Sequence, residues 1–449
     1  MYNDCQLSQL PWLDSIPSHW SWIRNGALFD YHQDKVGDEY SKYQLLSLTT
    51  SGVKEKSLDE VTGKAPASYS GYQEVKPGDM VFCLFDLDVS AVFSGLSNYS
   101  GMITSAYDVA TPKRTYNNKF LDYWFQSVFF GRYYKIFAKS VRYTINWDVF
   151  KAIKSPVPPR EEQDQIVRYL DWQVSKINKL IQGYQKQKTL LNERKNVLID
   201  NAVTKGLNVS IERKTTKAEW MSDVPFHWAE MRVKNIFTEK NERSVDGHEP
   251  HLSMSQKKGL VTDDENIERR LLSESYAGAK LVDKDDLVLN RLKAHLGVFA
   301  LAPIHGVVSP DYTVLKLDKN RIIPKYAEHI LKCNSCRKEL VTRVRGIVEG
   351  FWRLYTDDLG SIYISLPNIE EQKQILEYIE KVEDRTNNLN TKLLEQISLL
   401  REYRTRLISD VVTGQMDVRG IEIPDYMPVE DIESSADLDL DEEVKSDAD

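Results

Sequence analysis

The chain has 449 residues and a formal net charge of −8, with 41% apolar and 28% charged residues. This composition excludes an intrinsically disordered chain, a collagen-like chain and a small disulfide scaffold, and the length predicts about two to four domains. No apolar run reaches the ~18 residues of a membrane span, the first residues lack the pattern of a secretory signal, and four cysteines fit a reducing compartment, so we expect a cytoplasmic protein without a membrane anchor.

The first motif along the chain is repeated further on. Residues 12–20 are WLDSIPSHW and residues 220–228 are WMSDVPFHW, which gives four identities at a shift of 208. Further matches at similar shifts join 75–81 to 282–288, 101–107 to 306–312, 158–166 to 367–375, and 198–204 to 407–413. So long a period indicates duplication of one large module and not a solenoid.

Each copy begins with a segment of mixed pattern, residues 1–158 and 207–367. Short β-rich runs bounded by Gly, Asp or Pro predict strands at 43–50, 78–85, 278–289 and 311–317. Residues 119–139 predict an aromatic-rich helix, and 325–344 predict its counterpart. We therefore expect an α+β protein with two tandem mixed α/β domains.

Each copy ends in a long helix, predicted at residues 159–206 and 368–415. Prolines 158 and 159 suit the start of the first, and Gly206 and Gly414 suit the two ends. Apolar residues at steps of three and four continue for about four heptads, which is typical of a coiled-coil seam. The predicted seam residues are Ile166, Leu170, Ile177, Leu180, Tyr184, Gln187, Leu191 and Leu198 in the first helix, and Ile375, Ile379, Val382, Leu389, Leu393, Gln396, Leu400 and Leu407 in the second.

A helix of about 45 residues is roughly 65 to 70 Å long, which is too long to bury its seam on one compact domain. The simplest partner is the other helix, in an antiparallel pair that gives the chain a pseudo-two-fold axis. The alternative is two separate helical arms that bind other proteins. Gln187 and Gln396 occupy matching seam positions, and a polar seam residue often fixes the register of a helix pair.

Motifs for catalysis and metal binding are missing from the sequence. There is no phosphate-binding glycine loop, no dinucleotide-binding turn and no Asn/Asp-Pro-Pro-aromatic loop of an amino-methyltransferase. Cys333 and Cys336 form a single Cys-x-x-Cys pair, whereas a structural zinc site usually takes four ligands. We expect no catalytic residue and no metal site, and we interpret His19 and His227 as structural because they lie in the repeated motif.

Basic and amide residues lie at matching places in the two copies. Residues 85–90 match 290–295, and residues 139–147 match 343–353. Such side chains suit phosphates and base edges; for any one of them alone an ordinary solvated loop is favoured, but the matched placement of the set in both copies favours contact with DNA. The candidate DNA-binding residues are Lys139, Arg142, Tyr143 and Asn146 in the first copy, and Arg291, Lys293, His295, Arg343, Arg345 and Arg353 in the second.

These features resemble the specificity subunits of type I restriction-modification systems. IPSHW at 16–20 and VPFHW at 224–228 are similar to the starts of that family's target-recognition domains. PPREEQ at 158–163 and LPNIEEQ at 366–372 are similar to the start of each long helix, with Arg160 in place of the usual apolar residue. The resemblance extends over residues 1–415.

The resemblance implies a non-catalytic subunit in which each recognition domain binds one half of a bipartite, asymmetric DNA target and the helix pair sets the gap. It implies double-stranded DNA, two adenine-N6 modification subunits and restriction-translocase subunits as partners. It also implies that S-adenosylmethionine, ATP and magnesium are bound by those partners, with no cofactor in this chain. Two other functions stay open on the residues alone: a self-sufficient DNA methyltransferase or nuclease, and a coiled-coil scaffold that does not bind DNA.

The end of the chain is strongly acidic. Residues 421–449 contain twelve acidic residues and one lysine, a net charge of −11, so residues 1–420 carry +3. We predict that residues 416–449 form a disordered tail. Such a tail could compete weakly with DNA, contact a partner or simply favour solubility.

Overall fold

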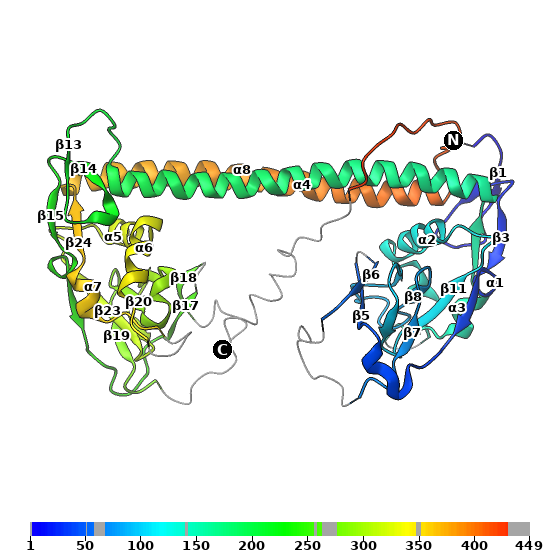
Figure 1. Cartoon of the computed structure of the whole chain (residues 1–449), viewed down its shortest axis with the longest axis horizontal. Helices are drawn as coiled ribbons and strands as arrows, with labels where there is room; N and C mark the ends of the chain where they lie inside the picture. Colours follow the sequence, from blue (N-terminus) through cyan, green and yellow to red (C-terminus); the bar gives the residue numbers. More distant parts are fainter. Residues whose placement is uncertain are drawn as a thin grey trace. The chain divides into compact units, whose positions relative to one another are not determined.

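The computed structural model describes residues 2–50, 52–57, 68–139, 142–255, 258–262, 276–346 and 352–429 (Figure 1). These residues form two compact units. Within the described ranges, unit 1 draws on residues 2–184 and 395–429, and unit 2 on residues 185–394. Each unit therefore contains one mixed domain and one part of each long helix.

The mixed domain of unit 1 is built on a four-stranded antiparallel sheet in the order β4-β11-β8-β9, with two-stranded pairs β1-β2, β3-β12, β5-β6 and β7-β10 around it. Its strands are β1 (Cys5–Leu7), β2 (Ser15–Pro17), β3 (Ser21–Arg24), β4 (Phe29–His32), β5 (Leu46–Thr49), β6 (Gly52–Glu55), β7 (Gln73–Val75), β8 (Met80–Phe82), β9 (Ser94–Leu96), β10 (Gly101–Ile103), β11 (Asp108–Pro112) and β12 (Lys154–Val157). Its helices are α1 (Asn25–Leu28), η1 (Gly37–Lys42), α2 (Asn118–Phe130), η3 (Tyr133–Phe137) and α3 (Trp147–Ala152).

Unit 2 repeats this sheet order as β16-β23-β20-β21, with pairs β13-β14, β15-β24, β17-β18 and β19-β22. Its strands are β13 (Arg213–Thr215), β14 (Asp223–Pro225), β15 (Ala229–Arg232), β16 (Phe237–Lys240), β17 (Leu252–Ser255), β18 (Gly259–Thr262), β19 (Lys280–Val282), β20 (Leu287–Asn290), β21 (Phe299–Leu301), β22 (Gly306–Val308), β23 (Tyr312–Leu317) and β24 (Tyr363–Leu366). Its helices are η4 (Glu219–Met221), η5 (Val233–Asn235), η7 (Arg291–Leu296), α5 (Pro324–Lys332), α6 (Asn334–Arg343) and α7 (Thr356–Ser361). The matching sheet order confirms the duplication predicted from sequence.

A repeated aspartate shapes the turn before the central strand of each sheet. Asp79 accepts a hydrogen bond from the Lys76 amide at 2.8 Å, and Asp286 accepts one from the Asp283 amide at 2.9 Å. In unit 2 this turn divides the predicted run 278–289 into β19 and β20, which belong to different sheets. The predicted single strand is therefore corrected to two.

The predicted helix 119–139 ends earlier, at Phe130. Asn117 caps its start by accepting from the amides of Lys119 and Phe120. After Gly131 the chain turns at Arg132, whose φ is +53°, and continues as η3. The Arg132 guanidinium donates to the Ser90 carbonyl at 2.6 Å and lies over the Phe129 ring, so contacts from a distant loop stabilise the break.

The predicted helix 325–344 is also two helices, α5 and α6, which meet at Cys333. Cys333 has extended backbone angles, and its sulfur accepts the Cys336 amide at the start of α6. Asp200 of the long helix accepts from the amide and the hydroxyl of Ser335 at 2.9 and 2.8 Å. A carboxylate at a helix N-terminus is favourable, and it secures α6 where the longer helix was expected.

The two long helices are α4 (Arg160–Lys205) and α8 (Ile369–Val412), and they lie side by side in Figure 1. In unit 1, Arg404 of α8 donates to the Asn178 side chain of α4 at 2.8 Å. In unit 2, Asn390 of α8 donates to the Asn192 side chain of α4 at 2.9 Å. The numbering falls along one helix as it rises along the other, so the pair is antiparallel as predicted, and the alternative of two separate arms is excluded.

The seam follows the predicted residues near the ends of the helices and departs from them in the middle. The buried predicted residues are Ile166, Leu170, Ile177, Ile375, Ile379 and Leu407, and the half-buried ones are Tyr184, Leu191, Leu198, Val382, Leu393 and Leu400. Leu180 is 53% exposed and its neighbour Ile181 only 3%. Gln187, Leu389 and Gln396 are also exposed, and Ile397 is buried beside Gln396. The buried positions shift by one residue because a helix with 3.6 residues per turn drifts against a 3.5-residue repeat. The polar side chains that meet across the pair are Asn192 and Asn390, in place of the predicted Gln187 and Gln396.

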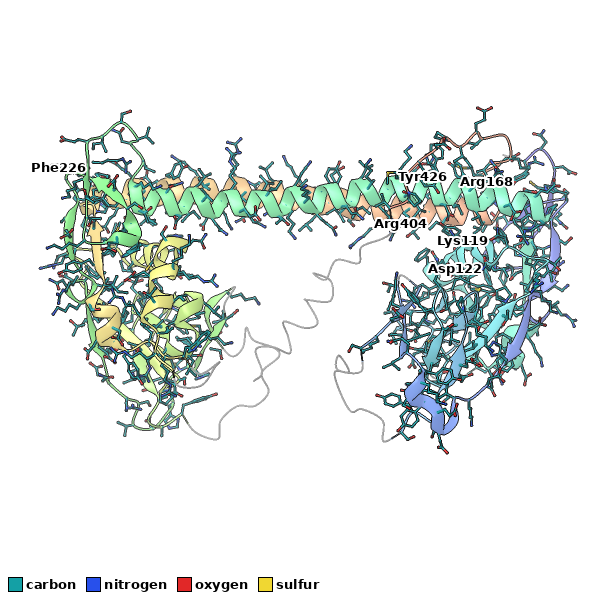
Figure 2. All side chains as sticks on the ribbon, viewed as in Figure 1. Lys119, Asp122, Arg168, Phe226, Arg404 and Tyr426 are labelled. Atoms are coloured by element: carbon teal, nitrogen blue, oxygen red, sulfur yellow. The ribbon has the colours of Figure 1, made fainter. Side chains whose placement is uncertain are left out.

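Residues 415–429, which we call the C-terminal segment, pack along α4 inside unit 1. Val418 is fully buried, and Gln165 of α4 donates to the carbonyls of Val418 and Ile421 at 3.0 and 2.8 Å. Further along, the Val429 amide donates to the Ser175 hydroxyl at 2.8 Å. Figure 2 labels Tyr426 of this segment and Arg168 of α4. Both residues line a pocket between the segment and the helix. The predicted disordered tail is thus corrected for residues 416–429, and residues 430–449 lie outside the described part of the chain.

None of the helices in the described ranges combines the length and apolar character needed to span a membrane.

Candidate nucleic-acid interface

In unit 1 the structure joins the two loops predicted to contact DNA. The Ile145 amide donates to the Leu84 carbonyl at 2.9 Å, and the Leu87 amide donates to the Tyr143 carbonyl at 3.3 Å. Arg142 forms a two-pronged ion pair with Asp86, with N···O distances of 3.0 and 2.9 Å. Residues 85–90 and 142–146 therefore form one surface.

Tyr143 and Asn146 belong to the same surface, and Lys139 lies close to it in sequence. Tyr143 has a φ of +46°, and the Lys135 ammonium lies 4.2 Å from the centre of its ring. Asn146 caps α3 by accepting from the Val149 amide at 2.9 Å, which leaves its NH2 group as the part able to donate elsewhere. Lys139 is exposed and directly precedes residues 140–141, which lie outside the described ranges.

Unit 2 joins the matching loops in the same way. The Leu354 amide donates to the Arg291 carbonyl at 3.1 Å, which connects η7 to the segment after α6. Arg345 and Arg353 exchange backbone hydrogen bonds of 2.9 and 2.8 Å as an isolated bridge. Residues 347–351 between them lie outside the described ranges. In both copies, two loops that the sequence analysis identified separately are thus joined by backbone hydrogen bonds.

The arginines of this surface are held by neighbouring acceptors. Arg291 donates to the Asp311 carbonyl at 2.7 Å, Arg343 binds the Glu339 carboxylate, and Arg345 binds Asp358. Lys293 is half-buried and Arg353 exposed; His295 belongs to η7, and its side chain is not described. Exposed ion pairs contribute only about 0 to 1 kcal/mol. A phosphate or base edge can therefore replace the carboxylate on a guanidinium that is already oriented.

Several side chains beside these loops were not predicted from the sequence. In unit 1, Tyr31 stacks on Trp147 with ring centres 4.3 Å apart and donates to Asp108 at 2.9 Å. Burial and the Asp108 carboxylate raise the pKa of Tyr31 to about 12. Tyr31 gave no signal in the sequence because one aromatic residue in a strand is ordinarily a core residue.

In unit 2, the side chain that the sequence analysis missed is Lys280 of β19. Its side chain is only 5% exposed, and its ammonium lies 3.8 Å from the Glu239 carboxylate. Burial lowers the pKa of Lys280, and Arg291 and Arg243 lower it further. A lysine inside a run predicted to be a buried strand was the available signal, because lysines are almost never fully buried without a partner.

Unit 2 also has a polar cavity of about 300 Å³ beside α5 and α4, lined by Lys195, Asn196, Ile199, Asp200, Lys325, Glu328, His329, Lys332, Cys333, Asn334 and Glu383. Burial and the nearby lysines lower the pKa of His329 to about 4. Burial raises the pKa of the Cys333 and Cys336 thiols, which keeps them neutral. Within the described ranges no three potential metal ligands come together.

The lowered pKa of His329 predicts that the free energy of unfolding of unit 2 depends on pH. The pKa of His329 is lower in the folded state than its ordinary 6.5, so its contribution is complete above pH 6.5 and is lost as the pH falls towards 4. The loss is expected to reach at most about 3 kcal/mol. Urea unfolding at pH 7.5, 5.5 and 4.5 should show a shallower pH dependence for His329→Gln than for the native chain. The exposed His248→Gln is the control, and equal slopes for all three proteins would contradict the prediction.

Comparisons with known proteins agree with this architecture. A model of the "type I restriction modification DNA specificity domain" matches residues 227–399. A putative type I restriction enzyme MjaX specificity subunit of Methanocaldococcus jannaschii is 23% identical over 410 residues, covering 88% of this chain and 91% of the relative. Residues 227–399 thus match the type I specificity domain, and the chain as a whole is similar to type I restriction enzyme specificity subunits. The EcoKI specificity subunit of Escherichia coli is 21% identical over 288 residues, covering 59% of this chain and 62% of the relative.

A solved structure with a TM-score above 0.5 shares the fold of this chain. One chain, from a study of complex assembly and conformational transition in the type I R-M system, aligns with a TM-score of 0.52 at 16% identity and covers 89% of this chain and 99% of its own length. The HsdS subunit of Thermoanaerobacter tengcongensis aligns with a TM-score of 0.45 at 14% identity, covering 89% and 98%. The family model matches residues of the second copy, and the motifs of that copy recur in the first.

Proposed function

We propose that this chain is the DNA sequence-specificity subunit of a type I restriction-modification complex. Each mixed domain binds one half of a bipartite, asymmetric target. The observation that carries the proposal is the duplicated pair of loops, because both units place oriented arginines on the surface formed by equivalent segments. A guanidinium held in place on an exposed loop can form paired hydrogen bonds with a guanine edge or with phosphate oxygens.

Joining two such domains supplies specificity that one domain lacks. A wrong base pair costs about 1 to 3 kcal/mol, so a domain that recognises three or four base pairs discriminates little across a genome. A stiff connection makes the second binding event effectively intramolecular. We propose that the antiparallel helices provide this connection and thereby set the number of base pairs between the half-sites.

The helix pair also offers surface for partner subunits. In unit 1, Leu180 and Leu399 are 53% and 57% exposed. In unit 2, Leu190 and Val197 are 52% and 55% exposed. We infer that two modification subunits dock on these helices and that restriction-translocase subunits join through them. S-adenosylmethionine, ATP and magnesium would then be bound by those cytoplasmic partners, and this chain would contribute recognition without catalysis.

The rival function is a self-sufficient DNA enzyme. Incubating the purified chain with DNA, S-adenosylmethionine and magnesium separates the two: we expect neither methyl transfer nor cleavage by the chain alone, and methyl transfer once the modification subunit is added. Binding to DNA in a gel-shift assay with that subunit separates the proposal from a scaffold that never contacts DNA.

Two arginines provide a direct test of half-site recognition. The target is first obtained by mapping methylated adenines in the host genome, and binding is then measured with every base pair of the target substituted in turn. We expect Arg142→Ala to reduce discrimination in one half-site and Arg345→Ala in the other, by about 1 to 3 kcal/mol at the affected positions. Arg406→Ala, on an exposed face of α8, is the control and should change neither. An effect of both arginines on the same half-site would contradict the proposal.

A further inference from the structure

Each unit contains a carboxylate that joins its mixed domain to the start of a long helix. In unit 1, Glu162 is 7% exposed; it accepts from the Trp20 indole at 3.1 Å and lies 2.6 Å from the His19 ring nitrogen. In unit 2, Glu371 accepts from the Trp228 indole at 3.1 Å and lies 2.7 Å from the His227 ring nitrogen. We call these two clusters the first and second junction.

The glutamine after each carboxylate adds a second attachment. Gln163 accepts from the Asn117 amide at 2.8 Å, just before α2. Gln372 accepts from the Ile323 amide at 2.8 Å, just before α5. Each glutamine also donates to the proline carbonyl five residues earlier, at 2.8 and 3.0 Å. The Glu-Gln pair thus connects one helix start to two separated parts of the same domain.

The same tryptophans meet the end of the other helix. Gly414 after α8 has a φ of +75°, and a Cβ there would lie 2.4 Å from Pro17 and 3.3 Å from Trp20. Gly206 after α4 has a φ of +74°, and a Cβ there would lie 3.4 Å from Trp228. In each unit, therefore, one tryptophan contacts the start of one helix and the end of its partner.

The first junction has additional contacts. The Tyr2 hydroxyl donates to Glu162 at 2.5 Å. Arg419 of the C-terminal segment lies 4.6 Å from the centre of the Tyr2 ring and binds Asp417. A carboxylate this well buried is stable only with such partners. Their presence indicates that the geometry around Glu162 is specified and not incidental.

We propose that Glu162 and Glu371 are positioning residues that fix the direction of each recognition domain on the helix pair and thereby decide which gap lengths the protein accepts. If a domain is about 30 Å across, a rotation of about 10° at its junction would displace the far side of the domain by roughly 5 Å. That displacement corresponds to about one and a half base pairs at ~3.4 Å per pair. Loosening a junction should therefore widen the accepted range of gaps. This inference rests on the proposed function.

The test uses the full chain with its modification subunit and a set of duplexes that keep both half-sites and vary the gap by up to two base pairs. We expect Glu162→Gln and Glu371→Gln each to lower the affinity ratio of the native gap to the neighbouring gaps at least fivefold. The cost of a substituted base within a half-site should stay unchanged. Trp20→Phe and Trp228→Phe keep an aromatic ring and remove the N–H donor, so they should act in the same direction while folding normally, as judged by thermal unfolding.

The matched controls are Glu161→Gln and Glu370→Gln, because these residues directly precede the junction carboxylates and are exposed. Equal loss of affinity for all gaps would show a merely structural role and overturn the inference, and so would unchanged gap selectivity in all four junction variants. If the native protein shows no preference for a bipartite target, the proposed function itself fails. That failure is visible before any variant is measured.

Discussion

A chain that lacks residues 185–191 of α4 and 391–397 of α8 is expected to bind the same two half-sites across a shorter gap. The shortening should be at most about three base pairs, because one heptad of helix is about 10.5 Å long and DNA rises ~3.4 Å per pair. Each base pair removed from the gap also rotates the second half-site by about 35° around the DNA axis. The gap is therefore expected to shorten by fewer than three base pairs. The target with the native gap should lose affinity about 100-fold or more, since both domains can no longer bind at once.

The deletion is designed to preserve the register of the helix pair. Asn178 meets Arg404 and Asn192 meets Asn390, so the numbering changes by fourteen along both helices between these contacts. The two deleted heptads therefore face each other, and removing only one of them is the control expected to unfold the pair locally. The measurement is binding to duplexes with graded gaps. Altered half-site preference at an unchanged gap would refute the idea that the helices set the spacing.

A chain that ends at Gly414 is expected to lose about 3 to 6 kcal/mol of stability in unit 1. It lacks the C-terminal segment, whose Val418 is fully buried, with Ile421 and Ile423 packed on the same core. Burial of one such side chain contributes about 1.5 to 3 kcal/mol, and each of its hydrogen bonds to Gln165 and Ser175 about 1 kcal/mol. Urea unfolding followed by hydrogen exchange in α2 and α4 measures the effect.

The control for this truncation is a chain that ends at Val429. It keeps the segment and removes residues 430–449, so its unfolding should match that of the native chain. Equal stability of both truncated chains would mean that the segment contributes nothing to unit 1. The same control tests the idea that the acidic residues compete with DNA, which requires a changed dependence of DNA affinity on salt.

The sequence by itself determined the duplication and the antiparallel pairing of the two long helices. The repeat was visible because the residues that build the junctions are chemically unusual and keep their spacing: Trp20 and Glu162 recur as Trp228 and Glu371. The helices were visible because an apolar periodicity of three and four residues, sustained over about four heptads, is typical of long paired helices. Matching loops on the two domains followed from the same repeat.

Tertiary structure alone decided where helices break, which seam residues are buried and what the chain does after α8. The break after Phe130 depends on the bond from Arg132 to Ser90, which lie far apart in sequence. The burial of Ile181 in place of Leu180 depends on how the second helix lies against the first. The C-terminal segment is held by contacts with α4 that no local propensity encodes. The periodicity of apolar residues predicts which face of a helix or strand is buried. The helix breaks, the buried seam residues and the position of the C-terminal segment depend on which other element packs against each one, and this is specified only in the folded chain.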